Sequence, residues 1–528
     1  MPMQSGDAAR SDVTRKPSSD FIDRRARRKT VGLIPATAIA IAFFYPAPAR
    51  GDTTERLLDQ LRTKGILTKS EYQELKRRHA AELAQHAVQQ AVAKSDGPAS
   101  KGDKPSAAPY DRFVTRADKG IGVRIGDVDV GLQGQLVFFG AEQFKQRGGN
   151  VAVGGGLSGG STINNSASIR SGLLPSSLVL NIATVQSGYN IGFTLGLYTG
   201  GNNVNVGLLN GNSSGTSVAM GTPGADVRQV FGTIGTPDIG TVKIGRDIGL
   251  FGSDAILNDF TLFGTGTIAG NASPANTSLG RIGFGYVYAD WIPQVSYTSP
   301  NFYGVTFSVG AFSPYQEFNN AGSFESPWGA APYSGTLTGH DQPGFQARVK
   351  YVGRLAPDVK LTAWTDGLTQ QHRVEADDAV LLPRGAAVRA WAVDGGARLD
   401  FGPATFVAYG YYGVGLGTTA LYFDGVSIDG ERRASSGFYA EAAYTLFERL
   451  TIGGSYGVSY LHANAIDYPR YHGDGTLVAS NASAIGFVRY QFSDWVTLQS
   501  EYIHSVSHNL IGEGISSDAL VLGTTFTF

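Results

Sequence analysis

The feature that most constrains this chain is an alternation of apolar and polar or small side chains with a period of two residues. In the stretch GFYAEAAYTLFERLTIGGSYGVSY (437–460), Phe438, Ala440 and Ala442 share one face, and Glu441 lies on the other. A second alternating segment follows the turn at 448–449. This period is that of β-strands, whose successive side chains point to opposite faces. The stretch therefore predicts two antiparallel strands joined by a tight turn.

The same pattern recurs from about residue 111 to the end of the chain. Further hairpins centre on the turns at 356–358 and 493–494. The strands are about ten residues long, with short turns at one end and long loops rich in Gly, Asn and Ser at the other. We therefore predict an all-β fold, a transmembrane antiparallel β-barrel of about sixteen strands.

The last eight residues, VLGTTFTF, form the final strand of this pattern. Leu520, Leu522, Phe526 and Phe528 share one face, and small or polar residues alternate with them. An unpaired apolar strand at a sheet edge invites aggregation, whereas a strand that closes a barrel leaves no edge. We expect the final strand to pair with the first strand, near Ile121–Phe138.

Composition supports a barrel that crosses an outer membrane. Charged residues make up only 16% of the chain, Gly is abundant (71 residues), and the chain contains no Cys. Lipid-facing apolar residues that alternate with polar lumen residues give this average, and the absence of Cys is compatible with the cell envelope. A soluble β-sandwich or propeller is the alternative.

The region before the barrel divides into three segments. Residues 1–49 combine a basic cluster, an apolar run and the small residues Ala47-Pro48-Ala49, which indicates a cleaved secretory signal peptide. Residues 50–94 predict a periplasmic helical segment, solvated or coiled-coil-like. Residues 95–110 are a flexible linker. The barrel domain then occupies residues 111–528.

Two stretches resemble a known family. RQVFGTIGTPDIGTVKIGRD (228–247) and VSYTSPNFYGVTFSVGAF (295–312) resemble motifs of the Gram-negative trimeric general porins. The N-terminal helical segment is more similar to that of phosphate-selective porins. The resemblance implies a sixteen-stranded homotrimer with a third loop folded into the pore. It also implies a water-filled channel for passive diffusion of ions and small hydrophilic solutes across the outer membrane.

The same resemblance implies partners for the chain. These are outer-membrane lipid and lipopolysaccharide, small hydrophilic solutes and ions, and the machinery that assembles outer-membrane barrels. The terminal aromatic residue, Phe528, resembles the assembly signal that such barrels present to this machinery.

The segment between the two motifs, IGLFGSDAILNDFTLFGTG (248–266), lies where the inward loop would be. The resemblance implies that loop acids and wall bases face each other across a pore constriction, which creates a transverse field. Counting by twos places Arg246 with Val242 and Ile244 on the lipid side, so it faces inward only if its strand bends. The candidate constriction residues are the loop acids Asp254 and Asp259, then Arg246, and the bases Arg281, Arg348, Lys350, Arg398 and Arg489, which we expect on strands.

Charge leaves the solute preference open. Residues 111–528 carry 24 Lys and Arg against 32 Asp and Glu, a net charge of −8, whereas residues 1–110 carry 19 against 12. An acidic pore mildly favours cations. A phosphate- or anion-selective porin is the alternative, although it requires a ladder of bases and this sequence has scattered ones. The missing base at 295–298, where general porins usually carry one, also weakens strong anion attraction.

Functions of other classes have weaker support. Residues 156–160 match the G-x-S-x-G pattern of hydrolases, but they lack its strand-to-helix context. The His residues show no metal-binding spacing such as H-E-x-x-H. We therefore expect no enzyme activity, cofactor, metal site or nucleic-acid partner. An outer-membrane barrel enzyme and a purely structural or adhesive barrel are the remaining alternatives.

Overall fold

The computed structural model describes residues 114–116, 121–148, 157, 166–200, 226–268, 277–315, 339–374, 383–427, 430–464, 467 and 477–528. The predicted signal peptide, helical segment and linker lie outside the described residues. Within these ranges, no helix combines the length and the hydrophobicity needed to cross a membrane.

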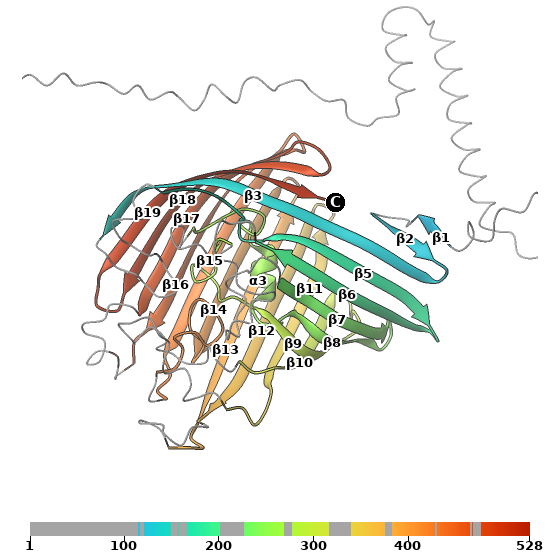
Figure 1. The fold of residues 1–528 in the computed structure, drawn as a ribbon, viewed down its shortest axis with the longest axis horizontal. Helices are drawn as coiled ribbons and strands as arrows, with labels where there is room; N and C mark the ends of the chain where they lie inside the picture. Colours follow the sequence, from blue (N-terminus) through green and yellow to red (C-terminus); the bar gives the residue numbers. More distant parts are fainter. Residues whose placement is uncertain are drawn as a thin grey trace, which may run out of the picture. The chain divides into compact units, whose positions relative to one another are not determined.

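Sixteen antiparallel strands close into one barrel (Figure 1). In ring order they are β3 (Val128–Gly148), β5 (Ser176–Gln186), β6 (Tyr189–Thr199), β7 (Asp226–Thr236), β8 (Gly240–Ile248), β9 (Trp291–Thr298), β10 (Val305–Phe312), β11 (Gly344–Ala356), β12 (Val359–Arg373), β13 (Ala387–Phe401), β14 (Ala404–Val414), β15 (Ala434–Leu446), β16 (Leu450–His462), β17 (Val478–Gln491), β18 (Val496–Asn509) and β19 (Gly514–Thr527). The short strands β2 (Ile121–Ile125) and β4 (Ser166–Arg170) pair with β3, and β1 (Val114–Arg116) pairs with β2. The short helix α3 (Ser253–Asn258) lies within the ring. The predicted all-β barrel of about sixteen strands is confirmed.

The last strand closes the barrel, as predicted. β19 pairs with β3 from Ile515 opposite Gly148 to Thr527 opposite Gln135. The backbone N–H of Phe528 extends this pairing by donating to the carbonyl of Gly134 at 3.0 Å. The partner strand begins after a turn at 126–127, so it overlaps the expected segment 121–138 and extends beyond it to Gly148. The polypeptide therefore reverses before the strand that closes the ring.

The predicted hairpins are present and keep their register. Leu446 pairs with Leu450 around the turn at 447–449, and Gln491 pairs with Thr497 around the turn at 493–494. The turn at 356–358 joins β11 to β12. Each tight turn therefore fixes which side chains of its two strands face each other.

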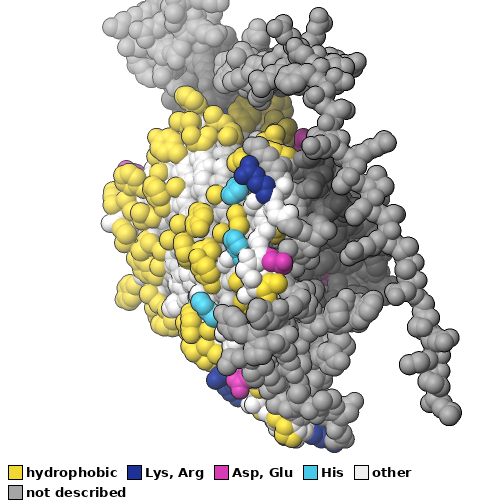
Figure 2. All heavy atoms as spheres, turned by 90° about the vertical axis from the view of Figure 1, so that its left-hand side faces the viewer, with side chains coloured by type: hydrophobic (Ala, Val, Ile, Leu, Met, Phe, Trp, Pro, Cys, Tyr) yellow, Lys and Arg dark blue, Asp and Glu magenta, His cyan; other side chains and the backbone are white. Residues whose placement is uncertain are grey.

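The two faces of the sheet differ in chemistry. On β15, Phe438 is exposed on the outer face, whereas Tyr439 and Glu441 are buried on the inner face. Hydrophobic side chains cover much of the outer surface in the view of Figure 2. An apolar exterior around a polar interior is the arrangement of an outer-membrane barrel.

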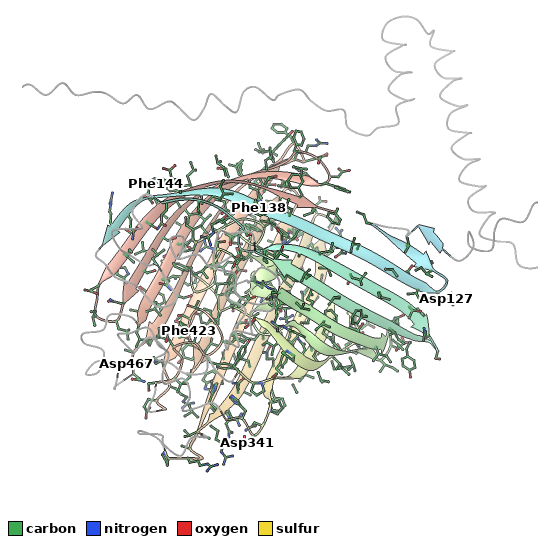
Figure 3. The ribbon with its side chains drawn as sticks, in the orientation of Figure 1. Asp127, Phe138, Phe144, Asp341, Phe423 and Asp467 are labelled. Carbon is green, nitrogen blue, oxygen red and sulfur yellow. The ribbon has the colours of Figure 1, made fainter. Side chains whose placement is uncertain are left out.

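Two loops occupy part of the barrel interior. The inward loop comprises the described residues 249–268 and 277–290, between β8 and β9, and includes α3. The second loop is residues 415–427, between β14 and β15. Its Thr419 carbonyl accepts a hydrogen bond from the N–H of Tyr288 at 2.9 Å. Phe251 of the inward loop and Phe423 of the second loop (Figure 3) belong to one buried apolar cluster. The resemblance implied the first loop but not the second.

Candidate functional site

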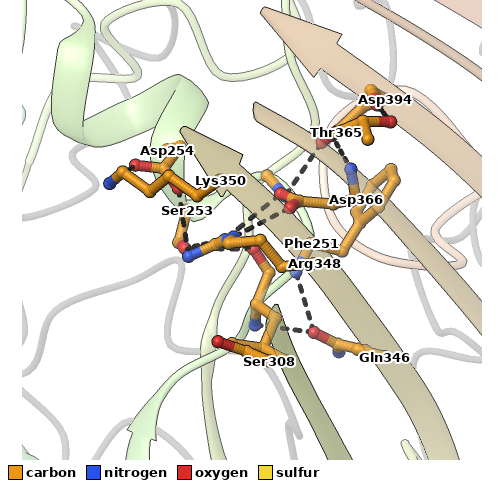
Figure 4. Close-up of polar contacts among 12 residues, drawn as sticks. Phe251, Ser253, Asp254, Ser308, Gln346, Arg348, Lys350, Thr365, Asp366 and Asp394 are labelled. Atoms are coloured by element: carbon orange, nitrogen blue, oxygen red, sulfur yellow. Dashed lines mark hydrogen bonds and ion pairs between the residues drawn. The ribbon is translucent and has the colours of Figure 1, made fainter. Parts of the chain in front are cut away.

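An ion-pair network fixes the start of the inward loop to the barrel wall (Figure 4). Arg348 on β11 lies between two carboxylates, with Nη1 at 3.1 Å from Asp254 of α3 and Nε at 2.8 Å from Asp366 of β12. Lys350 Nζ approaches the other oxygen of Asp254 at 2.5 Å. Buried charges are stable only when they are paired and hydrogen-bonded. Asp254, Arg348 and Lys350, three of the predicted residues, are therefore brought together.

Backbone amides immediately before α3 are hydrogen-bonded to side chains of the wall. Buried backbone N–H groups need such partners. Gln346 Oε1 accepts hydrogen bonds from the N–H groups of Leu250 and Phe251 at 2.7 and 2.9 Å. The Asp394 carboxylate accepts from the N–H of Gly252 at 3.0 Å and from the hydroxyl of Tyr409 at 2.9 Å. Inner-face side chains of β11 and β13 therefore hold this end of the loop.

Two wall carboxylates hold the middle of the loop in the same way. Glu441 on β15 accepts a hydrogen bond from the N–H of Phe260 at 2.8 Å. Glu501 on β18 accepts from the N–H groups of Thr265 and Gly266 at 3.0 and 2.8 Å. The loop is thus attached along the inner wall from β11 to β18.

Arg281 differs from its expected place on a strand. It lies in the inward loop, completely buried, with Nε at 3.6 Å from Glu441. Its Nη1 donates to the carbonyl of Ser483 on β17 at 3.1 Å, and Nε also contacts the hydroxyl of Ser455. Arg281 therefore attaches the loop to the wall and has no contact with open water.

The two loop acids are also buried, contrary to the expectation of an acidic surface facing the pore. Asp254 is 1% exposed and Asp259 is 3% exposed. The Asp259 carboxylate accepts hydrogen bonds from the N–H and hydroxyl of Thr261, both at 2.7 Å, and from the hydroxyl of Tyr286 at 2.9 Å. Both acids therefore face other parts of the protein.

The surface that the inward loop turns to the open lumen is apolar. Among the described residues of this loop, the most exposed are Leu257, at 57%, and Phe263, at 46%. Both project from a segment whose other side is attached to the wall. The loop thus presents hydrophobic groups where the sequence predicted carboxylates.

A hollow of about 320 Å³ lies beside α3, and we call it the α3 hollow. Its basic groups include Lys350, whose side chain is 30% exposed, and Arg398, at 34%. The Arg398 guanidinium pairs with Asp400 at 2.9 Å. The side chains that line the hollow include those of Leu257, Lys350, Val352, Lys360, Arg398 and Asp400. Because Asp254 is buried, positive groups outnumber negative ones on the open surface of the hollow.

The last two predicted bases lie in different places. Arg489 on β17 donates to Gln499 Oε1 at 3.0 Å and to the carbonyl of Phe260, so it also holds the loop. Arg246 on β8 pairs with Val230 and is buried, at 9% exposed, whereas Ile244, two residues earlier on the same strand, is 57% exposed. Alternation with a period of two therefore does not describe the environment of Arg246.

Sequence reasoning missed the wall carboxylates Asp366, Asp394, Glu441 and Glu501. The sequence does contain a signal for Asp366, because residues equidistant from a tight turn face each other across a hairpin. Arg348 and Asp366 are equidistant from Pro357, and the structure pairs them. In the described part of the chain, His, Asp and Glu side chains form no group of three that could hold a metal ion.

Comparison with known proteins adds independent information. A family model described as Gram-negative porin matches residues 126–505. The outer membrane channel DcaP of Acinetobacter baumannii is 14% identical, with a TM-score of 0.54 over 78% of this chain and 99% of that chain. An anion-selective porin from Comamonas acidovorans is 15% identical, with a TM-score of 0.49 over 76% of this chain and 100% of that one. A search of curated proteins finds no match. The similarity to the first structure shows a shared fold.

Proposed function

This chain belongs to the Gram-negative porin family, and we propose that solutes cross its barrel through the part of the lumen that the two loops leave open. The protein is a channel of the outer membrane for passive diffusion. The main support for this path is that the inward loop is attached to the inner wall of the barrel from β11 to β18. A cavity of about 540 Å³ remains beside β3 and β5 to β7, with Gln135, Asn181 and Gln229 among its polar lining groups.

We propose that three copies of the chain assemble, each with its own pore, as the family resemblance implies. Planar-bilayer recordings of the purified protein should show a conductance that rises in proportion to KCl concentration. Each insertion should close in three equal steps, because the three pores conduct independently. Native mass spectrometry in mild detergents should give the mass of three chains. A conductance that saturates at low salt would contradict free diffusion, and a single-chain mass in every detergent would contradict the trimer.

We further propose that the chain has no catalytic step. Buried carboxylates of the lumen are candidates for a general acid or base. Those of Asp394, Glu441 and Glu501 accept hydrogen bonds from backbone amides of the inward loop, and Asp366 is paired with Arg348. These groups are occupied in holding the loop.

Charge near the α3 hollow supports a mild preference for anions. Replacing Asp254 with Asn should raise the permeability ratio of chloride to potassium by roughly twofold, because a unit charge at about 8 Å in water contributes about 0.5 kcal/mol. The Lys350 ammonium would then face the hollow without its carboxylate partner. The measurement is the reversal potential across a KCl gradient near 0.1 M, where the Debye length is about 10 Å.

The matched control for this prediction is Asp259→Asn, which removes the same charge from a position outside the lining of the hollow. Its reversal potential should stay close to that of the parent. Near 1 M KCl the effect of Asp254→Asn should fade, since the Debye length falls to about 3 Å. Equal shifts for the two variants would show that the α3 hollow does not control ion preference. Specific phosphate transport has less support, because Asp400 is paired with Arg398 in this hollow.

A further inference from the structure

The α3 hollow brings together two surfaces of opposite character. Leu257 of α3 and Val352 of β11 expose apolar side chains there. Lys350, Lys360 and Arg398 line the same hollow with positive groups. Lipid explains the exposed apolar side chains on the outer face of the barrel, but it does not explain Leu257, which is on the inward loop. Apolar surface exposed to water is unfavourable, and such a patch in a cavity is typical of a binding site.

The positive groups have hydrogen-bonding capacity beyond their partners within the protein. An ammonium group has three N–H donors, and a guanidinium has five. Lys350 directs one hydrogen bond to Asp254 at 2.5 Å, and the Nε of Arg398 donates to Asp400 at 3.0 Å. Lys360 is exposed and lies opposite Asp400 in the register of β12 and β13. The hollow can therefore accept one more anionic group.

We propose that the α3 hollow is a binding subsite for small organic carboxylates that carry an apolar body, such as an aromatic monocarboxylate. The carboxylate would pair with Lys350, Lys360 or Arg398, and the apolar body would lie against Leu257 and Val352. The volume of about 320 Å³ is at the lower end of the range of small-molecule sites, about 300–1,000 Å³. This inference rests on the proposed function, because the solute reaches the hollow through the lumen.

The apolar side chains and the bases of the α3 hollow together favour a ligand that contacts both over one that contacts only one kind of group. An inorganic anion gains nothing from Leu257 and Val352. A neutral aromatic compound gains nothing from the three bases, and an aromatic amine is repelled by them. Only a solute with both a negative charge and an apolar surface uses the whole hollow.

The test uses the full-length channel in planar bilayers, with benzoate as the probe. Benzoate added to KCl should reduce the ion current at lower concentrations than acetate, benzyl alcohol or benzylamine. Leu257→Ser should raise the half-blocking concentration of benzoate roughly three- to tenfold, through loss of apolar contact, and leave that of acetate unchanged. Lys360→Gln should raise the half-blocking concentrations of both anions.

The matched control is Phe263→Ser, which removes an exposed apolar side chain of the same loop from a place outside the hollow. Its benzoate block should equal that of the parent. The inference is overturned if benzoate blocks no better than acetate, or if Leu257→Ser and Phe263→Ser behave alike. If either result occurs while KCl conductance is normal, the proposed channel function is unaffected. A parent protein that does not conduct KCl would contradict the channel function itself.

Discussion

Replacing Arg348 with methionine is expected to lower the free energy of unfolding of the barrel by roughly 3–5 kcal/mol, the cost of removing one partner from a buried ion pair. The guanidinium lies between the carboxylates of Asp254 and Asp366, and only 12% of the side chain is exposed. Methionine fills much of the same space but cannot donate hydrogen bonds. Asp254 retains Lys350, whereas Asp366 loses its ion-pair partner at 2.8 Å.

The measurement is urea-induced unfolding of the folded protein in phospholipid vesicles. Adding Asp366→Asn to Arg348→Met should recover part of the lost stability, since the second change removes the unpaired charge. The matched control is Arg354→Met on the same strand, whose exposed side chain donates to the Pro357 carbonyl and should affect stability little. A double variant whose loss equals the sum of the two single losses would contradict the network. The open-channel current of Arg348→Met should also be noisier, because the loop loses one attachment.

The barrel was predictable because its signals are local. Alternation with a period of two, short turns and a terminal aromatic strand all act over a few residues, and the strand count followed from length. The position of the turn at Pro357 also indicates that Arg348 lies opposite Asp366. Such contacts can be found by counting outward from a tight turn.

The environment of the pore was less predictable because it depends on contacts between distant segments. Glu441 and Phe260 are 181 residues apart, and no local pattern relates them. Asp259 is hydrogen-bonded to Thr261 and Tyr286 of its own loop, and Asp254 forms ion pairs with β11. Arg281 was expected on a strand, but it belongs to the loop. Alternation with a period of two groups Arg246 with Ile244, yet Arg246 is buried and Ile244 is exposed.

The second large effect concerns Leu257, the most exposed described side chain of the inward loop. The natural chain contains no Cys, so Leu257→Cys provides a single thiol. A bulky, charged, water-soluble thiol reagent should react with it and lower the current through each pore by roughly half or more, because the added group occupies the solute path. In a trimer, the loss should occur in three separate steps.

Two control variants show whether a fall in current comes from a thiol that reacts inside the pore. Ala255→Cys places the thiol two residues away in α3, at a buried position, and should neither react nor change the current. Ile239→Cys places it in the exposed turn between β7 and β8 and should react without reducing the current. Together they separate reaction within the pore from reaction elsewhere on the protein.

The current through Leu257→Cys channels before and after complete modification therefore tests most directly whether the inward loop borders the solute path. The structure predicts a stepwise fall in current for this variant and none for the two controls. An unchanged current, with modification of the thiol verified by mass spectrometry, would contradict a path beside α3.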